Sequence, residues 1–148
     1  MGLLLWNCLN LVNAQDTAAR PAQPTIGANA PTSVTLACTS TGNCVNSLGT
    51  GALAPLLHRG SAKQAHTRLI NLLEAMNDVQ ITHVDELEIR CIFTTLLGFR
   101  DEVIFLIDAS GERVDFRSRS LVGLYDFGKN SARMKEFARQ FEIRPGSR

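Results

Sequence analysis

The chain has 148 residues, a length that suits one folded domain with a tail. It carries 15 Lys and Arg against 14 Asp and Glu, so its net charge is +1. A charge this close to zero excludes the strong global field with which many proteins attract nucleic acid or anionic membranes. We therefore expect no nucleic acid as a partner, and binding to any anionic surface would need a local patch.

The first 14 residues, MGLLLWNCLNLVNA, are apolar and contain no charged side chain. They end in Val-Asn-Ala, a small-x-small pattern that signal peptidase accepts, so we predict an exported protein that is periplasmic, secreted or lumenal. A remnant of a longer signal or anchor and a simply apolar N-terminus are the alternatives. The stretch is shorter than the roughly 20 apolar residues that cross a bilayer, so we expect no transmembrane span.

A change in composition separates this segment from the rest of the chain. Residues 15–35 hold three of the five prolines and show no hydrophobic periodicity, which predicts a flexible linker. We predict a single folded domain over residues 36–143, followed by a short tail over residues 144–148.

Two of the four cysteines lie close together in the stretch LACTSTGNCVNS. In an oxidising compartment, a disulfide between Cys38 and Cys44 is the leading interpretation. Unpaired thiols, a metal site and a Cys44 nucleophile are weaker alternatives, because Cys-x5-Cys is not a usual zinc spacing and no histidine is tied to Cys44. Cys91 falls in a strand pattern and is interpreted as a buried small hydrophobe. We predict no metal and no cofactor.

Two helices are predicted from apolar residues that recur at helical spacing. The first helix spans residues 62–77, and Ser61 and Gln64 form a capping box at its start. Asn130 or Ser131 is the expected N-cap of the second helix, which Pro145 and the following glycine end. The apolar stripes are Ala65, Leu69, Leu72, Leu73 and Met76 in the first helix, and Met134, Phe137, Ala138 and Phe141 in the second.

Four strand patterns lie between the helices, at residues 79–86, 87–96, 102–108 and 113–121. They are rich in β-branched residues or alternate between apolar and polar residues, and ASGE at 109–112 supplies turn chemistry for a hairpin. The predicted fold is therefore α+β: a helix, a four-stranded antiparallel meander and a C-terminal helix, with both helices packed on one face of the sheet.

The hairpin allows a prediction of register. If Asp108 and Glu112 flank the turn, Asp101 opposes Arg119 and Val103 opposes Arg117. Asp101 and the two arginines would then share the face opposite the core, and the core face would carry Ile104, Leu106, Val114 and Phe116. A salt-bridge ladder exposed to solvent is the simpler interpretation. The sharper one is a small anion-binding surface formed by the forked donors of Arg117 and Arg119.

The triplet Asp126-Phe127-Gly128 matches the magnesium-binding triplet of protein kinases, but the other kinase motifs are missing. We interpret it as a turn between the last strand and the helix. Gly123 and Gly128 would permit a tight backbone, and the Asp126 carboxylate would bond to nearby backbone amides.

The runs CTSTGNCVNS, LLGFRDEVIFLID and VDFRSRSLVGLYDFGKNSARMKEFARQF fall in this order between residues 36 and 141. Together they resemble the domain of unknown function 1499 family of bacteria, algae and plants. The resemblance implies an exported or lumenal domain, without an established activity. The positions that match the family pattern are Asn43, Cys44, Val45, Phe99, Asp101, Val103, Phe105, Arg117, Ser118, Ser120, Gly123, Asp126, Gly128, Asn130 and Arg133.

Some positions depart from that pattern. Glu102 stands in place of a second aspartate, and Ile104 in place of a strand glutamate. Leu121 and Ser131 each replace an arginine. The changes at Ile104, Leu121 and Ser131 remove charges from the polar cluster that the motifs would otherwise form.

Two hypotheses of function follow. The first is a non-enzymatic extracytoplasmic domain that binds a protein partner or a small anionic ligand, as an accessory part of a membrane-associated complex. The second is a small hydrolase or redox enzyme that uses Asp101, Asp126 and Arg117, or Cys44. Adjacent residues of a strand point to opposite faces, so Asp101 and Glu102 cannot share a site without a β-bulge, which argues against a carboxylate dyad. The candidate ligand-binding residues are Asp101, Arg117, Arg119, Asp126, Asn130 and Arg133.

Overall fold

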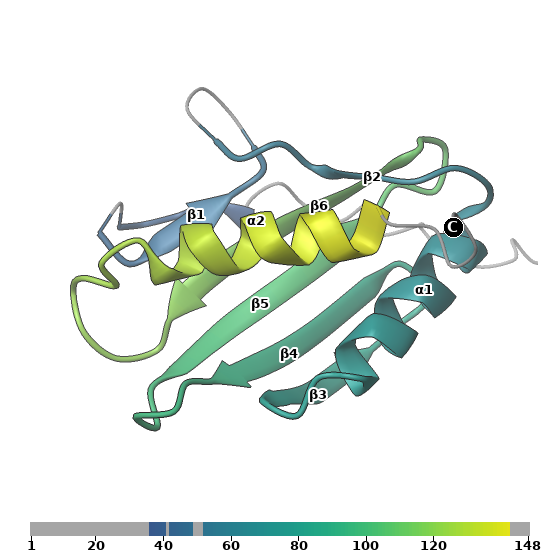
Figure 1. The fold of residues 1–148 in the computed structure, drawn as a ribbon. Helices are drawn as coiled ribbons and strands as arrows, with labels where there is room; N and C mark the ends of the chain where they lie inside the picture. Colours follow the sequence, from purple (N-terminus) through teal and green to yellow (C-terminus); the bar gives the residue numbers. More distant parts are fainter. Residues whose placement is uncertain (1–35, 41, 49–51, 143–148) are drawn as a thin grey trace, which may run out of the picture.

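The computed structural model describes residues 36–40, 42–48 and 52–142 (Figure 1). The predicted N-terminal segment, the linker, the tail and the residues expected to end the second helix lie outside the described residues. Within them, no helix is long and apolar enough to cross a membrane.

The described residues form one antiparallel sheet and two helices, so the predicted α+β class is confirmed. The sheet has six strands, not the predicted four, because two short strands, β1 and β2, each pair with β6. Strands β3, β4, β5 and β6 form the predicted meander. The elements in chain order are β1 (Cys44–Asn46), β2 (Leu56–Leu57), α1 (Ala62–Glu74), β3 (Val79–Val84), β4 (Glu88–Thr94), β5 (Arg100–Ile107), β6 (Arg113–Ser120) and α2 (Lys129–Glu142).

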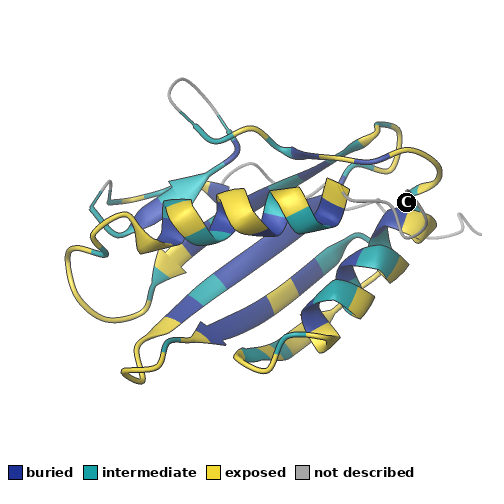
Figure 2. Ribbon diagram, viewed as in Figure 1, coloured by how far each residue is buried: buried dark blue, intermediate teal, exposed yellow. Residues whose placement is uncertain are grey.

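Both helices cover the same face of the sheet (Figure 1), and the main core lies between them and the strands (Figure 2). The predicted apolar stripes supply this core: Leu69 and Leu73 of α1 and Phe137 and Phe141 of α2 are buried. The Phe137 ring lies 5.0 Å from that of Phe105 in β5. Helix α1 begins with the predicted capping box and ends three residues earlier than expected. The sequence periodicity therefore placed both helices correctly against the sheet.

The predicted hairpin register is wrong by one residue. Asp108 and Arg113 flank the turn, with a backbone hydrogen bond from the Asp108 amide to the Arg113 carbonyl. Asp101 consequently pairs with Ser120, and Arg119 pairs with Glu102. The turn holds four residues rather than three, because the Asp108 carboxylate accepts hydrogen bonds from Ser110 and widens the loop.

A slip of one residue exchanges the two faces of a strand. Val103, Phe105 and Ile107 of β5 face the helices, whereas Ile104 and Leu106, predicted for this core, pack on the opposite face against Leu36. Asp101 moves to the helix side for the same reason. Arg117 and Arg119 stay on the opposite face, so the prediction that all three share one face is wrong.

Candidate functional site

Two polar clusters on opposite faces of the sheet contain five of the six candidate residues. The sixth, Asp126, accepts a hydrogen bond from the backbone amide of Asn130 beside the first cluster. On the helix side, the Asp101 cluster consists of Asp101, Ser118, Ser120, Asn130 and Arg133. On the opposite side, the Glu102 cluster consists of Glu102, Arg117 and Arg119. The predicted ligand-binding set therefore does not form a single site.

The Asp101 cluster is built around a buried ion pair. A guanidinium nitrogen of Arg133, in α2, lies 2.7 Å from Asp101 Oδ2. The Arg133 side chain is 16% exposed and the Asp101 side chain 4%. Ser120 donates a hydrogen bond of 2.6 Å to Asp101 Oδ1. The guanidinium also stacks over the Phe93 ring, with Cζ 5.0 Å from the ring centroid. The partner of Asp101 is thus an arginine of α2 that the hairpin argument did not consider.

Asn130 links α2 to the sheet through all of its amide atoms. Its Oδ1 accepts hydrogen bonds from Ser118 at 2.7 Å and from Arg133 at 3.0 Å. Its Nδ2 donates to the Asn43 carbonyl and to Ser120 Oγ, each at 3.1 Å. The side chain is fully buried, and its hydrogen bonds to Ser118, Ser120 and the Asn43 carbonyl fasten the start of α2 to β6 and to the segment before β1.

Asp126 caps the start of α2. The prediction that its carboxylate bonds to nearby backbone amides is confirmed. Its carboxylate accepts hydrogen bonds from the amides of Gly128 and Asn130, each at 2.9 Å. The helix begins at Lys129, so the prediction that Asn130 or Ser131 is the N-cap is wrong. Both glycines of this segment have the expected positive φ, 90° at Gly123 and 77° at Gly128.

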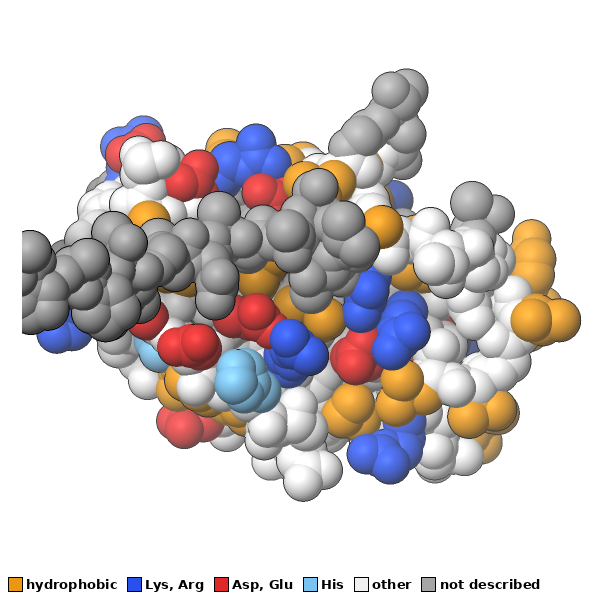
Figure 3. Space-filling model, turned by 180° about the vertical axis from the view of Figure 1, so that it is seen from behind, with side chains coloured by type: hydrophobic (Ala, Val, Ile, Leu, Met, Phe, Trp, Pro, Cys, Tyr) orange, Lys and Arg blue, Asp and Glu red, His pale blue; other side chains and the backbone are white. Residues whose placement is uncertain are grey.

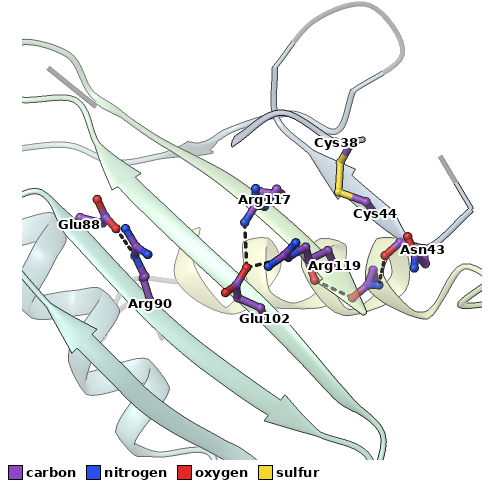
Figure 4. A network of polar contacts seen from close by, with 10 residues as sticks. Cys38, Asn43, Cys44, Glu88, Arg90, Glu102, Arg117 and Arg119 are labelled. Atoms are coloured by element: carbon purple, nitrogen blue, oxygen red, sulfur yellow. Dashed lines mark hydrogen bonds and ion pairs between the residues drawn. A yellow bond between two sulfur atoms is a disulfide. The ribbon is translucent and has the colours of Figure 1, made fainter. Parts of the chain in front are cut away.

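The Glu102 cluster joins two arginines to one carboxylate. Oε2 of Glu102 accepts from Arg117 and from Arg119, each at 2.8 Å (Figure 4). Burial opposes ionisation of Glu102, but the hydrogen bonds and charges of Arg119 and Arg117 outweigh it and lower the pKa of the carboxyl below its usual value of 4.5. Two positive charges share one negative charge here, and the Arg117 Nε is buried without a hydrogen-bond partner among the described residues.

Exchanging Glu102 for glutamine should make the protein less sensitive to acid. A carboxyl with a lowered pKa stabilises the fold above pH 4.5, and this contribution is lost as the pH falls through the folded value. Wild-type protein loses part of this stabilisation on acidification from about pH 7 to about pH 3, whereas Glu102→Gln lacks it at both pH values. Thermal unfolding at the two pH values should give a smaller drop in Tm for the variant. An equal drop in both proteins would contradict the pairing.

The three cysteines among the described residues supply no free thiolate. Cys38 and Cys44 form a disulfide, in agreement with the leading interpretation (Figure 4). Cys91 is buried, as expected, and burial raises the pKa of its thiol to about 12, so it stays protonated at neutral pH. No group of three or more His, Cys, Asp or Glu side chains suited to a metal occurs within the described ranges.

Two neighbouring loops at one end of the sheet expose large hydrophobic side chains. We call these residues the loop tip. They come from the β4–β5 loop and the β6–α2 loop, which lie at the left end in Figure 1 and are mostly exposed in Figure 2. Seen from behind, hydrophobic side chains gather at the corresponding right-hand edge in Figure 3. The residues of the loop tip are Leu96, Leu97, Phe99, Leu121, Val122, Leu124, Tyr125 and Phe127.

The loop tip was not among the sequence predictions. A pocket of about 160 Å³ lies between its two loops, lined by Phe99, Val122 and Phe127 and reaching Asp101 and Ser120. The one signal in the sequence was the pair of adjacent leucines before Gly98, at a place where turns usually carry polar residues. No sequence pattern indicated that the hydrophobic side chains of the β6–α2 loop are exposed, because their exposure depends on the tertiary structure.

A larger groove of about 610 Å³ runs along the outer side of α1, and none of the candidate residues lines it. Polar residues such as Lys63, Thr67 and Asn71 line it, with Gln140 from α2, but most of the surface that faces the groove is apolar. Size alone would make this groove the first choice for a ligand site. No acidic residue lies among the described residues that line it, so these residues supply no carboxylate for acid-base chemistry.

A comparison with protein-family models decides which family the fold represents. The model described as "Protein of unknown function (DUF1499)" matches residues 35–141, which include every described strand and nearly all of α2. The chain belongs to this family. The resemblance found in the sequence is therefore confirmed. Searches of curated proteins and of solved structures gave no significant match for the chain.

In this DUF1499 domain, most of the polar positions that carried the resemblance hold the chain together. Ser118, Ser120, Asn130 and Arg133 belong to the Asp101 cluster, and Asp126 caps the helix beside it. The matched Asn43 bonds to this region as well, through its carbonyl. The motif residues that suggested a binding site thus mainly attach helix α2 to strand β6 of the sheet.

Proposed function

We propose that this DUF1499 domain is a non-enzymatic binding domain that works outside the cytoplasm and contacts its partner through the loop tip. The observation that carries the proposal is the exposure of eight large hydrophobic residues on two adjacent loops. Scattered exposed hydrophobic residues are normal, but a contiguous patch usually marks a binding surface. A membrane-associated complex is the setting that we propose, with the domain as an accessory part.

The bonding of the Asp101 cluster supports a binding role over catalysis. Asp101 is held by Arg133 and Ser120, so its carboxylate would have to break an ion pair before it could act as a base. Glu102 lies on the other face of the sheet, and Cys44 is in the disulfide. The hydrolase or redox hypothesis would require a rearrangement of these groups.

The Cys38–Cys44 disulfide supports the extracytoplasmic part of the proposal, because disulfides form and persist in oxidising compartments. The apolar sequence of the first 14 residues points in the same direction.

A small anionic ligand at the Glu102 cluster is a second candidate. It is favoured by the unequal charge of two arginines against one glutamate and by the unpaired Nε of Arg117. An anion with two oxygens could bond to both guanidinium groups on the face of the sheet opposite the helices.

Site-specific photocrosslinking distinguishes the two surfaces. The photoreactive residue benzoylphenylalanine would replace Leu97 in the loop tip, Arg90 on β4 beside the Glu102 cluster or Glu136 on the exposed side of α2, in full-length chains produced in the native cell. We expect adducts with lipid or protein from the Leu97 position and few from the Glu136 position. Adducts that form at the Arg90 position but not at Leu97 would contradict the proposal and favour the second candidate.

A further inference from the structure

We infer that the partner of the loop tip is the surface of an anionic lipid bilayer, into which the leucine and aromatic side chains insert. This inference rests on the proposed function, since it names the partner of the same surface. Three observations carry it: the way each loop projects its side chains, the bonds that join the loops, and the charges around them.

The β4–β5 loop is a tight turn that points two leucines into solvent. The Gly98 amide donates to the Thr95 carbonyl at 2.8 Å, and the Thr95 amide donates to the Phe99 carbonyl at 2.8 Å. Gly98 has a φ of 82°, which glycine adopts without strain. Leu96 and Leu97 occupy the corner of this turn, and Leu97 is 77% exposed. A bonded turn holds these side chains outward instead of letting them fold back onto the sheet.

The β6–α2 loop projects further large side chains beside this turn. Leu124 is strongly exposed, and the rings of Tyr125 and Phe127 lie 5.7 Å apart edge to face. Phe127 is 85% exposed and has a φ of 54°, a left-handed conformation that favours glycine over a bulky residue. Neither its backbone conformation nor burial within the described structure favours phenylalanine here, which suggests that the ring is buried by something outside the chain.

Bonds between the two loops make them one surface. The Leu121 amide donates to the Arg100 carbonyl at 2.9 Å, and the Lys129 ammonium lies 6.0 Å from the centre of the Phe99 ring. The Asp126 amide donates to the Gly42 carbonyl, which anchors the middle of the longer loop. The apolar side chains are therefore presented together, with little ordering left to occur on binding.

The charges beside the loop tip favour anionic headgroups over a protein surface. Arg100 and Lys129 are exposed where the loops join the sheet and α2. Asp126 is the one acidic residue from 95 to 100 and from 121 to 129, and its carboxylate is bonded to two backbone amides. Leucine and aromatic side chains that project beyond a basic rim suit the bilayer interface, where rings and leucines insert and cations meet lipid phosphates.

Vesicle flotation with the full chain tests this inference. The probes are vesicles of phosphatidylcholine with about 30% phosphatidylglycerol, and vesicles of phosphatidylcholine alone, at about 0.1 M salt. We expect wild-type protein to float with the anionic vesicles, and Leu97→Ser/Leu124→Ser to bind them at least tenfold more weakly. Lys129→Gln should weaken binding to the anionic vesicles by about fivefold and change binding to neutral vesicles little.

The matched control is Leu57→Ser, which removes an exposed leucine from β2 and should bind as wild type does. Residues 1–14 are identical in all of these proteins, so a difference between them reports the loop tip. Circular dichroism melts should show that all variants fold.

The other outcomes overturn the inference in distinguishable ways. Failure of wild-type protein to float, together with protein adducts from Leu97 in the crosslinking experiment, would leave the proposed function standing with a protein as the partner. Sedimentation that shows a dimer broken by Leu97→Ser/Leu124→Ser, without lipid binding, would make a second copy of the chain the occupant. Equal flotation of wild type and the double variant, with no adducts at Leu97, would overturn both proposals.

Discussion

Replacing Arg133 with methionine should lower the free energy of unfolding by about 3–5 kcal/mol, because it leaves the Asp101 carboxylate buried without its counter-ion. Methionine keeps much of the packing on the Phe93 ring, so the loss reports mainly the missing charge and hydrogen bonds. Urea unfolding, followed by circular dichroism, gives the free energy of unfolding for wild type and variant.

The control for this prediction neutralises both members of the pair. In Asp101→Asn/Arg133→Met the asparagine still accepts the hydrogen bond from Ser120, and no buried charge remains. We expect the double variant to lose no more than about 2 kcal/mol relative to wild type, because replacing a whole buried ion pair is far less harmful than breaking it. A loss below about 1 kcal/mol for Arg133→Met alone would mean that the pair is not buried as described.

Substituting Asn130 with alanine should lower the free energy of unfolding by about 2–4 kcal/mol. The change removes two accepted and two donated hydrogen bonds, and it leaves buried partners such as Ser118 without the bond that satisfies them. Asn43→Ala is the matched control, because the Asn43 side chain donates from a more exposed position to the Gly123 carbonyl. We expect the control to lose less than about 1 kcal/mol in the same urea experiment. Equal losses would contradict the central place of Asn130 in the cluster.

The helices and the meander could be predicted from the sequence because each buries one periodic face. The leucines of α1 and the phenylalanines of α2 recur at helical spacing, and a sheet covers both stripes. Strands β1 and β2 could not be predicted in this way, because two or three residues carry no readable alternation. They form because the exposed edge of β6 offers hydrogen-bonding groups to any chain segment that passes it.

The candidate site was partly predicted, and the misplacement of Asp101 has one origin. Both Asp101 and Arg133 were recognised, but the register error of one residue placed Asp101 opposite Arg119 and hid its contact with α2. Alternation along β5 could not correct this error, because residues 103–107 are apolar on both faces and fit either register. The loop tip could not be predicted, because the tertiary structure decides which apolar residues stay outside the core.

The central claim is that the family motif stabilises the fold, whereas the loop tip binds the bilayer. Vesicle binding by Asp101→Asn/Arg133→Met tests this claim most directly. The double variant removes the charges at the centre of the motif while all eight residues of the loop tip remain. We predict that it floats with anionic vesicles within about twofold of wild type, while Leu97→Ser/Leu124→Ser does not. If Asp101→Asn/Arg133→Met is fully folded but does not float, the central claim is contradicted, because the Asp101 cluster itself would then be the binding site.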